Sequence, residues 1–251
     1  MTAMRLKRWV IGAALCGVGW FHGEVQAREY LVNQGYKTAE QGEFAVEIYN
    51  DMNFSDADTE ASYNSKHQLE LEYGALDHFQ LAYYEVYTWD RQKDWERDAF
   101  KIEAKWRLAN AGQWPVDVAL YTEYKNPDGH RGIRSDELEN KIIVSKDVGP
   151  VNLVGNFIFE KALNTSHDWT FEYTAGIRYR LTPRTRVGLE LKETLGDSDE
   201  FGVRRPDHEL QLVPGVSMSL TKHLEILLGI GFGLTRASDD VQLKSIIEWE
   251  F

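Results

Sequence analysis

Charged side chains alternate with apolar ones along two short stretches of the sequence. In FKIEAKWRL, residues 100–108, charges occupy every second position, and Arg178 and Arg180 alternate in the same way within GIRYRL. Successive side chains of an extended strand point to opposite faces, so these charges share one face. Charged rings that line a pore select the solutes that pass through it. The candidate lining residues are Lys101, Glu103, Lys105, Arg107, Arg178, Arg180, Glu47, Glu70 and Glu72.

Small residues form a second pattern near the end of the chain. They alternate in VPGVSMS and in GIGFG, so they are expected on the same face as the charges. Two neighbouring strands would then present a smooth inner wall against which something bulky lies, and a lead-in with Tyr30, Leu31 and Tyr36 is one candidate. GIGFGL is a poor nucleotide-binding loop because no helix follows it. The wall residues are Gly215, Ser217, Ser219, Gly229, Gly231 and Gly233.

Other chemistry has little support in the residue pattern. The sequence has no G-x-S-x-G motif, Ser217 falls within an expected strand, and no serine and histidine show a spacing that suggests a catalytic pair. Cys16 is the one cysteine, so no cysteine metal or haem site is possible. A net charge of −12 disfavours nucleic acid, whose phosphates need basic partners. We therefore expect no enzymatic activity, no cofactor, no metal and no nucleic-acid partner.

The region from residue 43 to residue 251 consists of segments in which apolar and polar positions alternate. A period of two indicates β-strands with one apolar and one polar face, and no convincing helix competes with them. The segments at 78–89 and 137–147 alternate poorly, so we expect bulges there. The twelve expected strands cover 43–54, 66–76, 78–89, 98–109, 114–125, 137–147, 150–162, 168–181, 185–195, 208–220, 223–235 and 241–251.

The connections between these strands alternate between long and short. Polar stretches such as SDADTEASYNS and GDSDEFGVRRPD follow odd strands, whereas tight turns such as VGP and TPR follow even ones. A membrane barrel has short turns on one side and long loops on the other. A soluble β-sandwich would also alternate, but it has no reason to keep this loop order. The sequence therefore predicts an all-β fold, a transmembrane antiparallel up-and-down β-barrel of about twelve strands.

The first 27 residues have the pattern of a secretory signal peptide. Basic residues precede a short apolar stretch, and VQA offers small side chains for cleavage after Ala27. Cys16 would leave with this peptide. The expected organisation is a signal peptide over 1–27, a periplasmic lead-in or partial plug over 28–42, and the barrel over 43–251.

The last strand carries the signature of a known class. Ile247, Trp249 and Phe251 occupy alternate positions up to the last residue, on an apolar face that needs an apolar medium. Aromatic residues also gather near both ends of the strands, as they do at the two interfaces of a membrane. Together with the signal peptide and the alternating strands, these residues make the chain resemble a Gram-negative outer-membrane β-barrel of the small porin or transporter-like kind.

The resemblance implies a location and partners. The expected location is the cell outer membrane, where the barrel-assembly machinery would read Ile247, Trp249 and Phe251 as an assembly signal. The expected surroundings are outer-membrane lipid and lipopolysaccharide. A small polar solute is the expected ligand, and a monomer is the expected state.

Three functions fit a charged barrel of this size. The hypothesis that we adopt is that the protein is a narrow channel or passive transporter for small polar or charged solutes. The alternative is a closed barrel with a structural, adhesion or envelope-integrity role, because eight strands are closed by side chains, sixteen leave a channel, and twelve lie between. An outer-membrane hydrolase comes third.

Deleting Phe251 should lower the folded fraction in outer membranes, because the terminal aromatic residue marks the strand that is recognised during insertion. The measurement is the heat-modifiable band of the outer-membrane fraction in gel electrophoresis. A Phe251→Tyr variant keeps an aromatic ring and serves as the control. Unchanged folding and abundance after the deletion would contradict the membrane interpretation.

Overall fold

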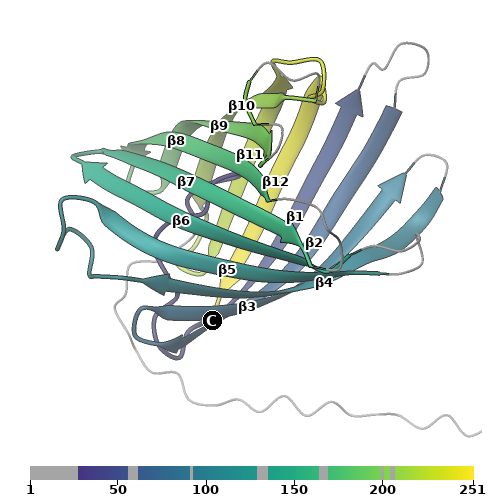
Figure 1. Cartoon of the computed structure of the whole chain (residues 1–251). Helices are drawn as coiled ribbons and strands as arrows, with labels where there is room; N and C mark the ends of the chain where they lie inside the picture. Colours follow the sequence, from purple (N-terminus) through teal and green to yellow (C-terminus); the bar gives the residue numbers. More distant parts are fainter. Residues whose placement is uncertain are drawn as a thin grey trace, which may run out of the picture.

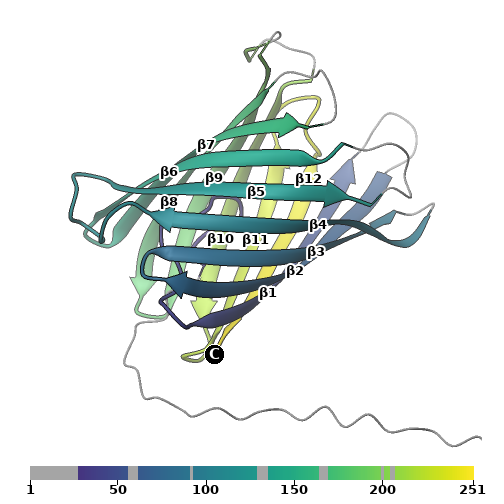
Figure 2. The ribbon, with the colours of Figure 1, turned by 60° about the horizontal axis from the view of Figure 1, so that its bottom comes forward.

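The chain folds into a closed barrel whose wall is one continuous sheet. In the computed structural model, each strand pairs antiparallel with its neighbours in sequence, and β1 closes the ring against β12. Figure 1 shows this closure as the yellow β12 beside the purple β1, and Figure 2 shows β1 to β7 following one another around the wall. The predicted all-β class, barrel and strand number are confirmed. The structure describes residues 28–55, 62–90, 93–128, 135–163, 169–198, 201–203 and 207–251, so the predicted signal peptide lies outside it.

Twelve strands are present in the described residues, which contain no helix long and apolar enough to cross a membrane. The strands are β1 (Phe44–Ser55), β2 (Ser62–Leu76), β3 (Phe79–Asp90), β4 (Lys93–Arg107), β5 (Asp117–Pro127), β6 (Glu137–Val148), β7 (Val151–Ala162), β8 (Thr170–Thr182), β9 (Thr185–Asp197), β10 (Glu209–Ser219), β11 (Leu224–Gly233) and β12 (Val241–Glu250).

The period of two sorts the side chains between the outside and the lumen. On β1, Ile48 points outward and is 44% exposed, whereas Glu47 points inward and is buried. On the neighbouring β2, Leu69 is likewise exposed and Glu70 is buried. The apolar outer face and the charged inner face are those of a barrel that meets lipid outside and water or protein inside.

Two expectations about the strands need correction. β4 begins at Lys93 and not near residue 98, because the main chain continues its ladder with β3 through pairs such as Thr88↔Glu96 although the sequence there is polar. The expected bulge of β3 is present between Val86 and Tyr87, but β6 pairs with both neighbours without a register shift. The irregular pattern of β6 instead reflects Ile143, which is buried on the inner face.

The lead-in runs inside the barrel. Residues 28–43, which we call the lumen segment, form no strand, and Tyr30, Asn33 and Tyr36 within it are almost completely buried. The segment joins β1 through a turn at Gly42, whose φ of 89° favours glycine. The Gly42 amide donates to the carbonyl oxygen of Gly74 at 2.8 Å, which ties this turn to β2.

Placing a charge on the outer face should destabilise the barrel. Ile177 on β8 is 47% exposed on that face, and an arginine near the middle of a bilayer costs about 2–4 kcal/mol. Ile177→Arg should therefore lower the free energy of unfolding by that amount in urea titrations of the barrel in lipid vesicles. Ile177→Leu, the matched control, and Glu103→Gln in the lumen should cost much less. Equal effects of Ile177→Arg and Ile177→Leu would show that this face does not meet lipid.

Candidate functional site in the lumen

The backbone of the lumen segment wraps around one carboxylate. Glu190 on β9 is 2% exposed and accepts hydrogen bonds from the amides of Leu31, Val32 and Asn33 at 2.8, 2.8 and 2.9 Å. The side-chain amide of Asn33 donates a fourth bond at 3.0 Å. Consecutive backbone N–H groups make a concave site for an anion, so Glu190 fixes the course of the segment. Arg178 lies 3.6 Å from the same carboxylate and balances its charge.

Neutral side chains of the wall complete this attachment. The Asn156 side chain accepts from the amide of Gln34 at 2.7 Å and donates to its carbonyl oxygen at 3.0 Å, as a neighbouring strand would. Thr174 donates to the side-chain oxygen of Asn33 at 2.7 Å, and Gln80 accepts from the amide of Ala39 at 2.9 Å. Buried polar groups are costly unless they are paired, so these contacts allow a segment without regular structure to lie inside the wall.

Apolar contacts hold the segment at two further places. Leu31 packs in a lumenal cluster with Tyr49, Val213, Leu227 and Ile246. A Cβ atom at Gly215 or Gly229 would lie only 2.7 or 2.3 Å from the Cδ1 atom of Leu31, so a larger side chain at either position would have to displace Leu31. Leu31 is therefore the bulky group that lies against part of the small-residue wall.

The two tyrosines of the segment pack on the opposite part of the wall. Tyr30 and Tyr36 belong to a second buried cluster with Ala119, Tyr121, Ile143 and Val154. Burial raises the pKa of Tyr30, and it raises the pKa of Tyr36 to about 12. Both phenols therefore stay neutral at physiological pH and add no charge to the lumen.

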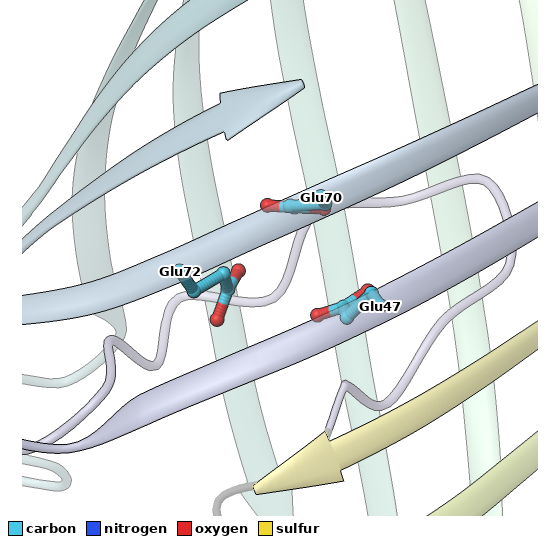
Figure 3. A group of neighbouring side chains, drawn as sticks. All are labelled: Glu47, Glu70 and Glu72. Carbon is cyan, nitrogen blue, oxygen red and sulfur yellow. The ribbon is translucent and has the colours of Figure 1, made fainter. Parts of the chain in front are cut away.

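An acidic cluster receives the start of the segment. The carboxylates of Glu47, Glu70 and Glu72 lie within 4.8 Å of one another, on the neighbouring strands β1 and β2 (Figure 3). The Arg28 guanidinium lies 3.6 Å from Glu47 and 4.0 Å from Glu70. The backbone nitrogen of Arg28 donates to Glu248 at 2.7 Å. Arg28 thus supplies positive charge to carboxylates that are themselves buried.

The predicted basic residues fall into two groups. Lys101 forms an ion pair with Glu123 at 3.0 Å, and Arg178 is paired with Glu190. Among the described residues, Lys105, Arg107 and Arg180 form no ion pair. The lumen segment lies between a cavity that Lys105 lines and a cavity that Arg178 and Arg180 line.

The remaining predicted residues are also on the inner face, with different neighbours. Glu103 accepts a hydrogen bond from the Tyr84 hydroxyl group. Ser217 accepts from Arg178 at 3.0 Å, and Ser219 donates to Glu225 at 3.0 Å. Gly231 and Gly233 are close to Gln242 and Asp239, not to the lumen segment.

The predicted C-terminal signal lies on the outside of the barrel. Ile247 and Trp249 are exposed on the outer face of β12, and Phe251 follows that strand. The Phe251 ring lies 5.7 Å from the Phe44 ring and 6.4 Å from the Trp249 ring. The three aromatic rings form a belt at the end of the barrel where β1 begins and β12 ends.

The lumen segment separates small cavities on the side of the short turns from a larger one on the side of the long connections. Two cavities of about 40 and 30 Å³ lie on the first side, and each has room for only a few water molecules. Val32 borders a cavity of about 250 Å³ on the second side, which we call the outer cavity. Its charged lining is mixed in sign and comprises Asp51, Lys66, Lys192, Glu209, Asp239 and Lys244.

Sequence reasoning missed the residues that hold the segment. Glu190 and Asn156 were two polar residues among many inward ones, and their role depends on strands far apart in the sequence meeting one stretch of chain. Ile246 was a usable signal, because it is the one inward apolar residue in an otherwise regular last strand. Such a residue indicates an apolar partner inside the lumen.

A closed twelve-stranded antiparallel barrel with an apolar exterior and a charged lumen defines the class of outer-membrane β-barrels. Solved structures of similar fold include an outer-membrane channel and two porins. The COG4313 outer membrane channel from Pseudomonas putida F1 has a TM-score of 0.64 and 14% identity, with 88% of this chain and 100% of that chain covered. No protein-family model and no curated protein matches the sequence.

Two porins share the same architecture. The KdgM porin has a TM-score of 0.60 and 10% identity, with 82% of this chain and 99% of that chain covered. The NanC porin has a TM-score of 0.55 and 10% identity, with 82% and 98% covered. At these identities the similarity establishes the fold, and function must be argued from the lumen itself.

Replacing Glu190 by Gln should loosen the lumen segment. The amide keeps one acceptor oxygen but points an NH₂ group at backbone N–H donors, and a hydrogen bond to a charged group contributes about 1.5–3 kcal/mol. Cleavage after Lys37 by trypsin, followed by mass spectrometry of the folded barrel, should become at least about tenfold faster. Glu172→Gln removes a lumenal carboxylate that pairs with Lys192 and not with the segment, so it is the matched control. Equal cleavage rates in both variants would mean that Glu190 does not hold the segment.

Proposed function

We propose that this protein is a narrow channel or passive transporter of the outer membrane for small polar or charged solutes, with the lumen segment as its constriction. The observation that carries the proposal is the way in which the segment is held. Its backbone is held by hydrogen bonds to polar side chains of the wall, chiefly Glu190 and Asn156, and water or a polar solute can replace such bonds. In this role the lumen conducts solutes and catalyses no reaction.

The charges without partners are proposed to set selectivity. Lys105, Arg107 and Arg180 lie on the short-turn side of the segment, and Lys66 lines the outer cavity; none of the four forms an ion pair with another described residue. A charge in a narrow pore acts strongly because little water screens it. These four residues favour anions, whereas the acidic cluster near Arg28 favours cations.

The proposed location and partners follow from the fold and the sequence pattern. Export by the signal peptide, with cleavage after Ala27, would deliver the chain to the outer membrane. The barrel-assembly machinery is proposed to recognise Ile247, Trp249 and Phe251, and lipid and lipopolysaccharide would surround a monomer. The proposed solute is a small polar or charged molecule.

A closed barrel with a structural, adhesion or envelope-integrity role is the second candidate. The observation that favours it is the smallness of the cavities on the short-turn side, together with the lumenal ion pairs of Lys101 and Arg178. If the segment never leaves its position, these contacts would close the lumen permanently.

Conductance in planar bilayers separates the two functions. The protein is produced without residues 1–27 and refolded, and a variant that also lacks residues 28–42 is compared with it. We expect the protein that keeps the lumen segment to give small conductance steps. The variant without residues 28–42 should give severalfold larger steps, because the segment fills the lumen between the cavities. Absence of conductance in both proteins would favour the closed barrel.

Selectivity is measured in the same deletion variant. Replacing Lys105, Arg107 and Arg180 with Gln should shift the reversal potential in a salt gradient towards cations, because the acidic cluster is then unopposed. An unchanged reversal potential would show that these three residues do not line the conducting path. Folding is checked by heat-modifiability, since lumenal substitutions change selectivity more than insertion.

A further inference from the structure

One group of polar side chains on the apolar outer face lies where β2, β1 and β12 run side by side. Asn50 on β1 follows Ile48 on that face, and Ser65 and His67 on β2 precede Leu69 on it. The surrounding positions are exposed apolar residues that suit a lipid phase. Polar and ionisable residues in contact with lipid are costly, so such a group points to a function.

The strand register brings these residues together. Asn50 pairs with His67 on one side and with Ser245 of β12 on the other. Ser65 precedes His67 by two positions, which places both side chains on the same face of β2. The sequence alone showed no suggestive Ser–His pair, because a spacing of two acquires meaning only when both residues lie in one strand.

The hydrogen bonds run in a fixed direction through this group. The Asn50 amide nitrogen donates to the Ser245 hydroxyl oxygen at 3.3 Å, which turns the amide oxygen towards His67. That oxygen lies 2.8 Å from Nδ1 of His67 and can only accept, so Nδ1 carries the proton. Nε2 of His67 is then free to accept from the hydroxyl group of Ser65, 2.9 Å away.

A hydroxyl group, a base that can take its proton and a third group that orients the base constitute the arrangement of a nucleophilic hydrolase. We propose that Ser65 and His67, positioned by Asn50, form an esterase site on the lipid-facing side of the barrel that cleaves acyl esters of membrane lipids. The site lies on the outer face, so it works independently of conduction through the lumen.

The surface beside the site favours an apolar acyl chain as part of the substrate. A groove of about 670 Å³ begins at Asn50 and is lined mainly by outward apolar side chains of β10, β11 and β12, among them Val216, Leu228, Ile230 and Leu243. A groove of this character on a lipid-facing wall is filled by hydrocarbon. An acyl chain in the groove would bring its ester group to the polar residues at the end of the groove.

The proposed reaction balances with water as the only co-reactant. Ser65 Oγ attacks the ester carbonyl carbon while Nε2 of His67 takes the hydroxyl proton. The carbon–oxygen bond to the alcohol breaks, and His67 returns the proton to the leaving oxygen. Water then attacks the acyl-serine, His67 accepts and returns a proton in the same way, and the fatty acid leaves with Ser65 restored.

The site is covered in the structure. Ser65 is 3% exposed, and the ring of Trp95 lies 4.6 Å from the ring of His67. An ester must displace neighbouring side chains to reach Oγ, so slow acylation is expected. A probe that reacts once and stays bound is therefore a more sensitive readout than turnover.

The test uses a fluorophosphonate probe with an alkyl chain, added to the full-length folded barrel in phosphatidylcholine vesicles. We expect one covalent label, located on Ser65 by peptide mass spectrometry, and slower labelling at acidic pH because a protonated imidazole cannot act as a base. Ser65→Ala should abolish the label, and His67→Gln should slow it by at least about 100-fold. Ser219→Ala removes a hydroxyl group of the inner face that bonds Glu225, leaves the Ser65–His67 bond in place and should still be labelled.

Absence of a label on the wild-type barrel, or a label on another residue, would overturn the proposal and leave a set of polar residues that only satisfy one another. This result does not depend on whether the variants fold, because the wild-type protein alone decides it. Asn50→Leu should shift the pH midpoint of labelling, since the amide oxygen no longer fixes the imidazole proton. An unchanged midpoint would remove Asn50 from the proposed site.

Discussion

The width of the lumen is the constraint on which the rest of this structure depends. Twelve strands enclose more space than wall side chains close by themselves, and the inward positions are largely charged. The lumen segment fills part of this space with its own backbone. Glu190 shows how the two requirements meet, because one buried carboxylate is satisfied by three successive amides that would otherwise lack partners.

The same constraint explains why the inner face is not uniformly polar. Leu31 needs an apolar surface inside a charged lumen, and Tyr49, Val213, Leu227 and Ile246 provide it. The segment is therefore located by a few polar contacts and two apolar anchors, with water-sized spaces on one side. Under the proposed channel function, hydrogen bonds to water would replace the polar contacts when the segment moves, and the two apolar anchors would have to leave their clusters.

The barrel could be predicted from the sequence because a period of two is a local property of each strand. The inward positions of Lys101, Glu103 and Arg178 follow from that period alone. Their partners do not, because ion pairs and the path of residues 28–43 depend on which distant strands face each other. The start of β4 was misplaced for a related reason, since the hydrogen-bond ladder extends a strand into polar sequence where side-chain alternation gives no signal. The group around His67 needed the register between β1 and β2, which no single strand contains.

The contact between the Arg28 nitrogen and Glu248 links the proposed maturation of the chain to its interior. In a precursor that retains residues 1–27, this nitrogen is an uncharged amide. Under the proposed cleavage after Ala27 it becomes an ammonium group, 2.7 Å from a buried carboxylate. Proteolysis would thus add a positive charge inside the barrel and turn that hydrogen bond into an ion pair, in which Coulomb attraction acts between the two groups. The proposed cleavage would then create the positive charge that fixes the start of the lumen segment only after export.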